Sequence, residues 1–79
     1  MRVQFRVPEL RPDEWADAAS GNPTMSRSEA LEYVRWHMKA NKMKIEDYRL
    51  YNEYTNDLIY PVNGSFRKTR VEQSKVVYQ

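Results

Sequence analysis

The residue types best suited to chemistry lie at the start of the chain, where polar and apolar side chains alternate strictly. The polar residues are Arg2, Gln4 and Arg6, and the apolar residues are Val3, Phe5 and Val7. This period of two predicts a β-strand over residues 2–7 with one polar and one apolar face. Arginine and glutamine can form paired hydrogen bonds with guanine and adenine. An ordinary solvated strand face has the same pattern, so the strand alone leaves both interpretations open.

A second candidate site is the start of a predicted helix. Ser26 and Glu29 have the spacing of a capping box, in which each side chain bonds the other residue's backbone N–H. The helix is expected to end near Asn41. Its apolar stripe is formed by Ala30, Leu31, Val34 and Met38. The free N–H groups at such a helix start can bind an anion.

Between these two segments the sequence predicts a shorter helix. Pro12 suits a first helical position, and the acidic residues that follow it suit the positive end of a helix dipole. Trp15, Ala18 and Ala19 follow at helical spacing, and Gly21 is a plausible stop. We therefore expect a helix over about residues 12–20.

The composition of the rest of the chain predicts β-strands. Residues 48–54 and 58–62 are rich in aromatic and β-branched side chains, and residues 65–71 predict a further strand. Asn63-Gly64 favours a type I′ hairpin turn, and Pro61 indicates an edge strand or a bulge. Residues 76–78 could add a little more strand structure.

The composition limits the classes of protein to which this chain can belong. The chain has 79 residues, no cysteine and a net charge of +2, with 13 basic and 11 acidic residues. It is one small domain without disulfides or a thiol nucleophile, and it has no apolar run long enough for a signal peptide or membrane span. We expect a cytoplasmic protein. Because so short a chain buries little surface, association with a second copy is the simplest way to complete a core.

Little in the sequence favours an enzyme. His37 is the single histidine, and its place among apolar helical residues is more typical of a core edge than of a catalyst. There is no glycine-rich phosphate loop and no paired-carboxylate spacing. We expect no catalytic residue, metal or cofactor.

Taken together, the order of strand, short helix, turn and capped helix resembles the ribbon-helix-helix family of DNA-binding proteins (MetJ and Arc type). Residues 2–8 resemble its DNA-reading strand, and residues 26–31 resemble the start of its second helix. The resemblance implies an α+β fold in which residues 1–42 form a β-α-α ribbon-helix-helix region of an intertwined homodimer. Residues 43–79 would then be a C-terminal extension, a β-hairpin or meander.

The resemblance also implies roles for individual residues. The two paired strands would read the major groove of double-stranded DNA through Arg2, Gln4 and Arg6. The second helix would clamp a phosphate through Ser26, Arg27 and Ser28. The dimer core would consist of Val3, Phe5, Val7, Ala30, Leu31, Val34 and Met38. The function implied is that of a small transcriptional repressor or autoregulator of phage, plasmid or antitoxin type.

The extension has two open interpretations. Its tyrosines, which are Tyr48, Tyr51, Tyr54 and Tyr60, could bind a partner protein, and its basic residues, which are Arg67, Lys68 and Arg70, could contact flanking phosphates. Alternatively, the strands enlarge the core or support a tetramer. A different hypothesis for the whole chain is a protein-binding module without DNA function, such as a phage-type inhibitor of a host complex that handles nucleic acid. In that case the first strand joins the C-terminal strands in one intramolecular sheet.

Overall fold

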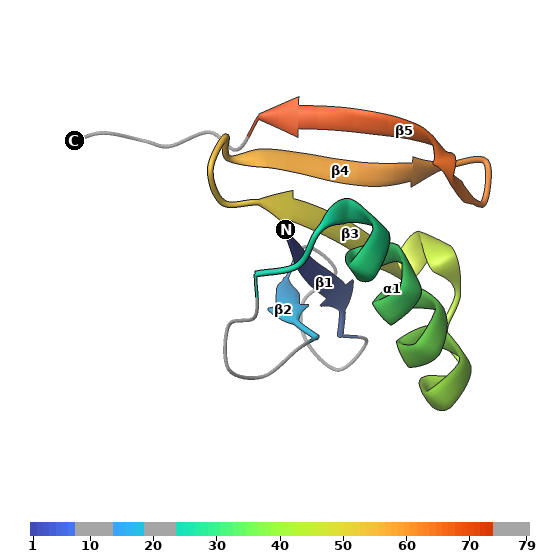
Figure 1. Ribbon diagram of the computed structural model, residues 1–79. Helices are drawn as coiled ribbons and strands as arrows, with labels where there is room; N and C mark the ends of the chain where they lie inside the picture. The colour runs from blue at the N-terminus through green and yellow to red at the C-terminus, as the bar shows by residue number, and fades with distance from the viewer. Residues whose placement is uncertain (8–13, 19–23, 74–79) are drawn as a thin grey trace.

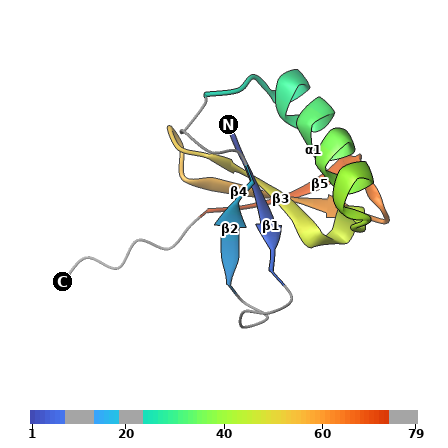
Figure 2. The ribbon, with the colours of Figure 1, turned by 90° about the horizontal axis from the view of Figure 1, so that it is seen from below.

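The structure is a computed structural model that describes residues 1–7, 14–18 and 24–73. In this part of the chain a five-stranded antiparallel sheet, in the order β2-β1-β3-β4-β5, carries a helix on one face (Figures 1 and 2). The strands are β1 (Arg2–Arg6), β2 (Trp15–Asp17), β3 (Tyr48–Asn52), β4 (Asp57–Val62) and β5 (Ser65–Gln73). The helix is α1 (Arg27–Asn41), and a 3₁₀ turn (Ile45–Asp47) precedes β3.

The first strand is paired on both sides within its own chain. Gln4 lies opposite Asp17 of β2 on one side and opposite Arg49 of β3 on the other. Both edges of β1 are therefore occupied, and no edge is left for the equivalent strand of a second copy. The predicted β-α-α ribbon-helix-helix fold with its intertwined dimer is wrong. The strand predicted to form the ribbon is an internal strand of a five-stranded antiparallel sheet, and the described residues contain one α-helix where two were predicted.

The predicted first helix is also wrong where the structure describes it. Trp15–Asp17 form β2, with Trp15 opposite Arg6. Trp15 has helical spacing to Ala18 and Ala19 but also the strand period of two with Asp17, and pairing with β1 decided between them. Pro12, Asp13 and Gly21, which gave start and stop signals for that helix, lie outside the described residues.

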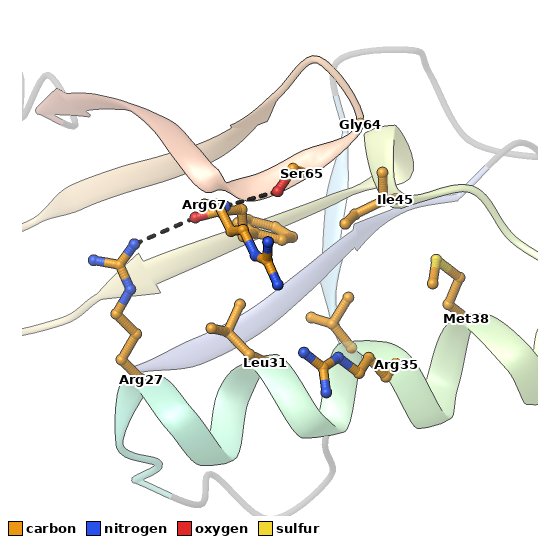
Figure 3. Close-up of a pocket in the computed structure, with 10 residues that line it drawn as sticks. Arg27, Leu31, Arg35, Met38, Ile45, Gly64, Ser65 and Arg67 are labelled. Atoms are coloured by element: carbon orange, nitrogen blue, oxygen red, sulfur yellow. Dashed lines mark hydrogen bonds between the residues drawn. The ribbon is translucent and has the colours of Figure 1, made fainter.

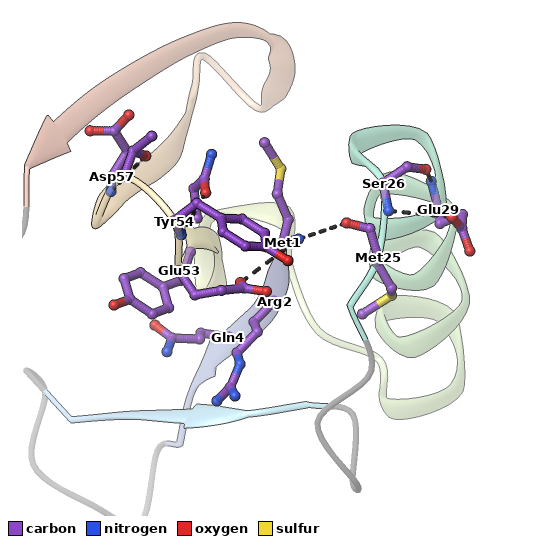
Figure 4. Close-up of polar contacts among 12 residues, drawn as sticks. Met1, Arg2, Gln4, Met25, Ser26, Glu29, Glu53, Tyr54 and Asp57 are labelled. Carbon is purple, nitrogen blue, oxygen red and sulfur yellow. Dashed lines mark hydrogen bonds and ion pairs between the residues drawn. The ribbon is translucent and has the colours of Figure 1, made fainter.

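The predicted capped helix is confirmed. Ser26 is the N-cap of α1: its Oγ accepts from the Glu29 N–H at 3.2 Å, and a Glu29 carboxylate oxygen accepts from the Ser26 N–H at 3.3 Å (Figure 4). The helix ends at Asn41, where Lys42 takes a left-handed conformation with φ 52°. Both ends are set by local chemistry.

The path of α1 follows from the sheet topology. β2 and β3 lie on either side of β1 and are both antiparallel to it, so they run in the same direction. A connection between parallel strands must cross the sheet, and a helix is the usual way to do so. α1 lies in that connection and packs most closely on β1 (Figure 1).

The strands after α1 largely follow the sequence prediction. The turn Asn63-Gly64 joins β4 to β5 with φ values of 53° and 71°, the positive values that a type I′ turn requires. Pro61 lies at a bulge, where the register between β4 and β5 shifts. Residues 76–78 lie outside the described residues.

The core lies between α1 and the sheet. Its buried residues are Val3, Ala30, Val34, Tyr48, Leu50, Ile59 and Phe66. Phe5, Leu31 and Met38 pack against it, and Val7 is half-buried. Apart from Val7, the residues expected to form a dimer core thus meet within one chain, together with side chains from β3, β4 and β5. None of the described helices is long and apolar enough to cross a membrane.

The start of β1 is tied to the segment that leads into α1. The Met1 nitrogen donates to the Met25 carbonyl oxygen at 2.6 Å, and the Met25 N–H donates back to Met1 at 3.3 Å (Figure 4). The same nitrogen lies 3.8 Å from a carboxylate oxygen of Glu53. These contacts position the helix start over the end of the sheet.

An aromatic cluster lies where α1 meets β1 and β3. The His37 ring lies 5.1 Å from that of Phe5 and 5.6 Å from that of Tyr48, and His37 Nδ1 is 2.6 Å from the Tyr48 hydroxyl. Burial lowers the pKa of His37. Burial, with the nearby Asp47 carboxylate and Tyr33, raises the pKa of Tyr48 to about 12. Near neutral pH, a neutral His37 and a protonated Tyr48 can therefore share one hydrogen bond.

The lowered pKa of His37 makes stability depend on pH. Between its ordinary value of 6.5 and its lower value in the folded state, the unfolded chain binds more protons than the folded one. We expect the free energy of unfolding, measured by urea titration, to fall as the pH is lowered from 7 through this window. The variant His37→Asn, which cannot titrate, should flatten the profile. An equally steep profile in that variant would assign the effect to other groups.

Completion of β1 within the chain gives a second prediction. The midpoint of urea unfolding should not change when the protein concentration is varied a hundredfold, because folding requires no second copy. Light scattering on the same samples gives the mass. A midpoint that rises with concentration would show that folding and association are coupled, as an intertwined ribbon would require.

Candidate functional site

The face of the sheet opposite α1, called here the helix-free face, collects most of the functional side chains. Val3, Leu50 and Ile59 point toward α1, so their neighbours along each strand point away. Within the described residues no helix covers this side (Figure 2). The side chains that the register places there are Arg2, Gln4, Arg6, Trp15, Asp17, Arg49, Tyr51, Leu58, Tyr60, Arg70 and Glu72.

Arg49 is the centre of this face. Its Nε donates to the Gln4 side-chain oxygen at 2.7 Å, and its Nη1 donates to the Tyr60 hydroxyl at 3.1 Å. Gln4 in turn donates through its amide nitrogen to Asp17 at 3.3 Å. A row of polar contacts therefore crosses four strands, and it holds the Arg49 guanidinium in one orientation.

Guanidinium groups and aromatic rings alternate along the same row. The Arg49 guanidinium lies 4.4 Å from the centre of the Trp15 ring and 5.9 Å from that of Tyr60. Arg6 lies over Trp15 at 5.2 Å, and Arg70 lies over Tyr60 at 4.7 Å. The two rings meet edge to face at 6.1 Å. Such cation–π contacts each stabilise by about 0.5–1 kcal/mol at exposed sites, so the row is ordered before any ligand binds.

The helix-free face carries more positive than negative charge. Asp17 pairs with Arg2 at 3.3 Å, and Glu72 pairs with Arg70 at 3.4 Å. Arg6 and Arg49 have no carboxylate within ion-pair distance in the described part of the chain. Exposed ion pairs contribute little, about 0–1 kcal/mol, so an anionic ligand can compete for the paired arginines as well.

This arrangement combines charges that attract phosphate with flat surfaces on which a base can stack. Arginine presents a planar fork that matches phosphate geometry and also stacks on rings. Trp15 and Tyr60 are half-buried, so part of each ring is accessible. The face contains the two kinds of group that proteins use to bind single-stranded nucleic acid.

The structure separates the residues predicted for base reading from those predicted for phosphate binding. Arg2, Gln4 and Arg6 share the helix-free face, as their alternation predicted. Ser26, Arg27 and Ser28 begin α1, on the other side of the sheet. The Ser26 hydroxyl is engaged in the cap, and Arg27 donates to the Phe66 carbonyl oxygen at 3.5 Å.

The predicted basic and aromatic residues of the extension also divide between the two sides. Arg70 lies on the helix-free face, Arg67 faces α1, and Lys68 is exposed on β5. Among the tyrosines, Tyr48 is fully buried in the core, Tyr54 is exposed in the turn after β3, and Tyr51 and Tyr60 lie on the helix-free face.

Two central residues of this face were missed in the sequence. Trp15 was assigned to a helix, and Arg49 was given no role. Arg49 could have been found, because it alternates with Tyr48 and Leu50 in the predicted strand. Trp15 could not, because its strand is three residues long and exists only through pairing with β1.

Comparisons with protein-family models, curated proteins and solved structures gave no match. In the described ranges, no three His, Cys, Asp or Glu side chains are grouped to hold a metal ion. A function for this chain is therefore inferred from the chemistry of its own surfaces.

The central position of Arg49 predicts a measurable effect on stability. Arg49→Ala should lower the free energy of unfolding by about 1–2 kcal/mol, because Gln4 and Tyr60 lose a charged hydrogen-bond partner. The stability of Arg49→Lys should lie between those of the wild type and Arg49→Ala, since lysine keeps the charge but not the planar guanidinium fork. Arg35→Ala, an exposed arginine on α1, is the control and should change stability by less than about 0.5 kcal/mol. Equal losses at both positions would contradict the assigned contacts.

Proposed function

We propose that this protein binds single-stranded nucleic acid through the helix-free face of its sheet. The observation that carries the proposal is the alternating row of Arg6, Trp15, Arg49, Tyr60 and Arg70. The partner predicted from the sequence was double-stranded DNA; the present proposal replaces the duplex with a single strand and the groove-reading strand with a stacking surface.

The binding mode follows from the chemistry of the row. Bases stack on the accessible parts of Trp15 and Tyr60 and on the Arg49 guanidinium, each stacked base contributing about 1–3 kcal/mol. Arg6 and Arg70, which lie at the two ends of the row, neutralise the phosphates on either side of the stacked bases. Because stacking needs only the flat face of a base, this mode tolerates many sequences.

The width of the face argues for a single strand and against the duplex groove. Five strands spaced about 4.8 Å apart span about 19 Å from β2 to β5. The major groove is about 12 Å wide and admits a two-stranded ribbon, but not a sheet of this width. Unpaired bases can instead lie across the strands, as in other sheet-based readers of RNA.

The second hypothesis from the sequence, a protein-binding module, is favoured by one observation. It required the first strand to join the C-terminal strands in one sheet, and β1 pairs with β3. A surface suited to a protein partner lies on the other side of the sheet, between α1 and β5.

Binding can be measured by fluorescence anisotropy with a labelled single-stranded oligonucleotide of about 12 nucleotides, within the usual site size for such surfaces. Trp15→Ala should weaken binding by roughly 5- to 100-fold, the equivalent of one lost stacking contact. Trp15→Phe, which keeps an aromatic ring, should weaken it much less. Arg6→Ala should also weaken binding and reduce its dependence on salt, because one phosphate contact is lost.

The control is Arg35→Ala, which removes the same charge from the other side of the sheet and should leave oligonucleotide affinity within about twofold. Circular dichroism establishes that each variant is folded. Equal weakening by Arg35→Ala and Arg6→Ala would show only non-specific attraction. Tighter binding to a duplex of the same sequence than to the single strand would refute the proposed mode.

A further inference from the structure

On the helix side of the sheet, an open groove lies between α1 and the start of β5. α1 packs most closely on β1, whereas β4 and β5 form a ribbon at the far edge of the sheet (Figure 1). The groove has a volume of about 310 Å³, at the lower end of the range for ligand sites. Its lining residues are Arg27, Leu31, Val34, Arg35, Met38, Ile45, Gly64, Ser65, Phe66 and Arg67 (Figure 3).

The floor of this groove is apolar. Val34 and Phe66 are buried beneath it, with 1% and 6% of their surface exposed. Leu31, Met38 and Ile45 are only partly buried and present aliphatic or thioether surface to the opening. Leucine and methionine side chains adapt readily to an inserted apolar group. An apolar anchor placed here would remove this surface from water.

The rim of the groove is positively charged. Arg27, Arg35 and Arg67 are all exposed, and they come from both walls (Figure 3). Within the described ranges none of the three forms an ion pair. Arg27 donates to the Phe66 carbonyl at 3.5 Å, a long contact that an incoming carboxylate can replace. At one end of the groove, the Glu46 carboxylate lies beside Gly64.

The groove is elongated. Its lining residues on α1 run from Arg27 to Met38, about 16 Å at the rise of an α-helix. That length matches about five residues of extended peptide. A nucleic acid would place phosphates on the three arginines but would bring no aliphatic group to the floor. The combined shape and charge therefore suit a peptide.

We propose that this groove binds a short acidic segment of a partner protein, with a leucine- or phenylalanine-type side chain inserted onto the floor and flanking carboxylates on the arginines. Charge complementarity identifies the partner's chemistry, and the apolar floor supplies the anchor. The site lies on the opposite side of the sheet from the helix-free face, so it does not depend on nucleic-acid binding.

The test uses the full chain and a dye-labelled peptide of about eight residues that alternates glutamate with leucine and phenylalanine, long enough to span the groove. We expect chemical-shift changes in an amide NMR titration at Leu31, Arg35 and residues 64–67, and not at Arg49. In anisotropy, Arg35→Glu should weaken binding at least tenfold, whereas Arg6→Ala should have no effect. Leu31→Trp, which fills the groove, should also abolish binding while the spectrum shows an intact fold.

Two matched peptides test the chemistry. Serine in place of the apolar residues should abolish binding, and lysine in place of glutamate should do the same. If the serine peptide binds as tightly as the parent, or if the shift changes fall outside the groove, the proposal is overturned. If decanoate displaces the labelled peptide but the unlabelled peptide does not, the groove binds a small amphiphile. If an oligonucleotide displaces the labelled peptide, and Arg35→Glu weakens that oligonucleotide's binding, the groove binds nucleic acid.

Discussion

The pairing of β1 with β3 is the contact on which the rest of the described structure depends. It joins the first strand of the chain to a strand more than forty residues later, with Val3 opposite Leu50 and Gln4 opposite Arg49. On one side of the sheet it closes the core, because Val3 and Leu50 are both buried under α1. On the other side it brings Gln4 within hydrogen-bond distance of Arg49. One ladder of backbone hydrogen bonds thus builds both the core and the helix-free face. The same pairing, together with β2, occupies both edges of the strand, which is why a second chain is not needed to complete it.

The two sides of the sheet show how a short chain divides its side chains between stability and recognition. A domain of this size buries only about 60% of the surface of its unfolded chain, so it has few core residues to spare. Here the core uses Ala30 and Val34 from α1, Tyr48 and Leu50 from β3, and one buried residue from each of β1, β4 and β5. On the helix-free face, the aromatic rings are partly covered by the arginines stacked against them, and these contacts stabilise the sheet as well as preparing it for a ligand. A ligand that stacks there binds groups whose orientation is already fixed, so it loses less entropy in ordering them.

The misassigned fold shows where local pattern stops being informative. The alternation over residues 2–7 and the capping box at Ser26 are real, and their order is the order of a ribbon-helix-helix protein. What differs is the segment between them, where Trp15–Asp17 is a strand. Three residues carry too little pattern to separate a period of two from a period of 3.6, so flanking signals decided the prediction. Once β2 is a strand, it covers one edge of β1 and the ribbon has no free edge. The polar side chains of β1 therefore face a wide intramolecular sheet, with Trp15 and Arg49 as neighbours.

By itself the sequence determined the features that depend on neighbouring residues. These are the start of α1, set by the Ser26 cap; the turn at Asn63-Gly64, which needs positive φ angles; the bulge at Pro61; and the polar face of Arg2, Gln4 and Arg6. Only the tertiary structure decided which strand pairs with which, and so which arginine lies against which ring. The physical reason is that a strand fixes its side-chain period locally but obtains its hydrogen-bond partners from anywhere in the chain. For β1 those partners are β2 and β3, and that choice placed Trp15 and Arg49 beside one another and opened the groove beyond α1.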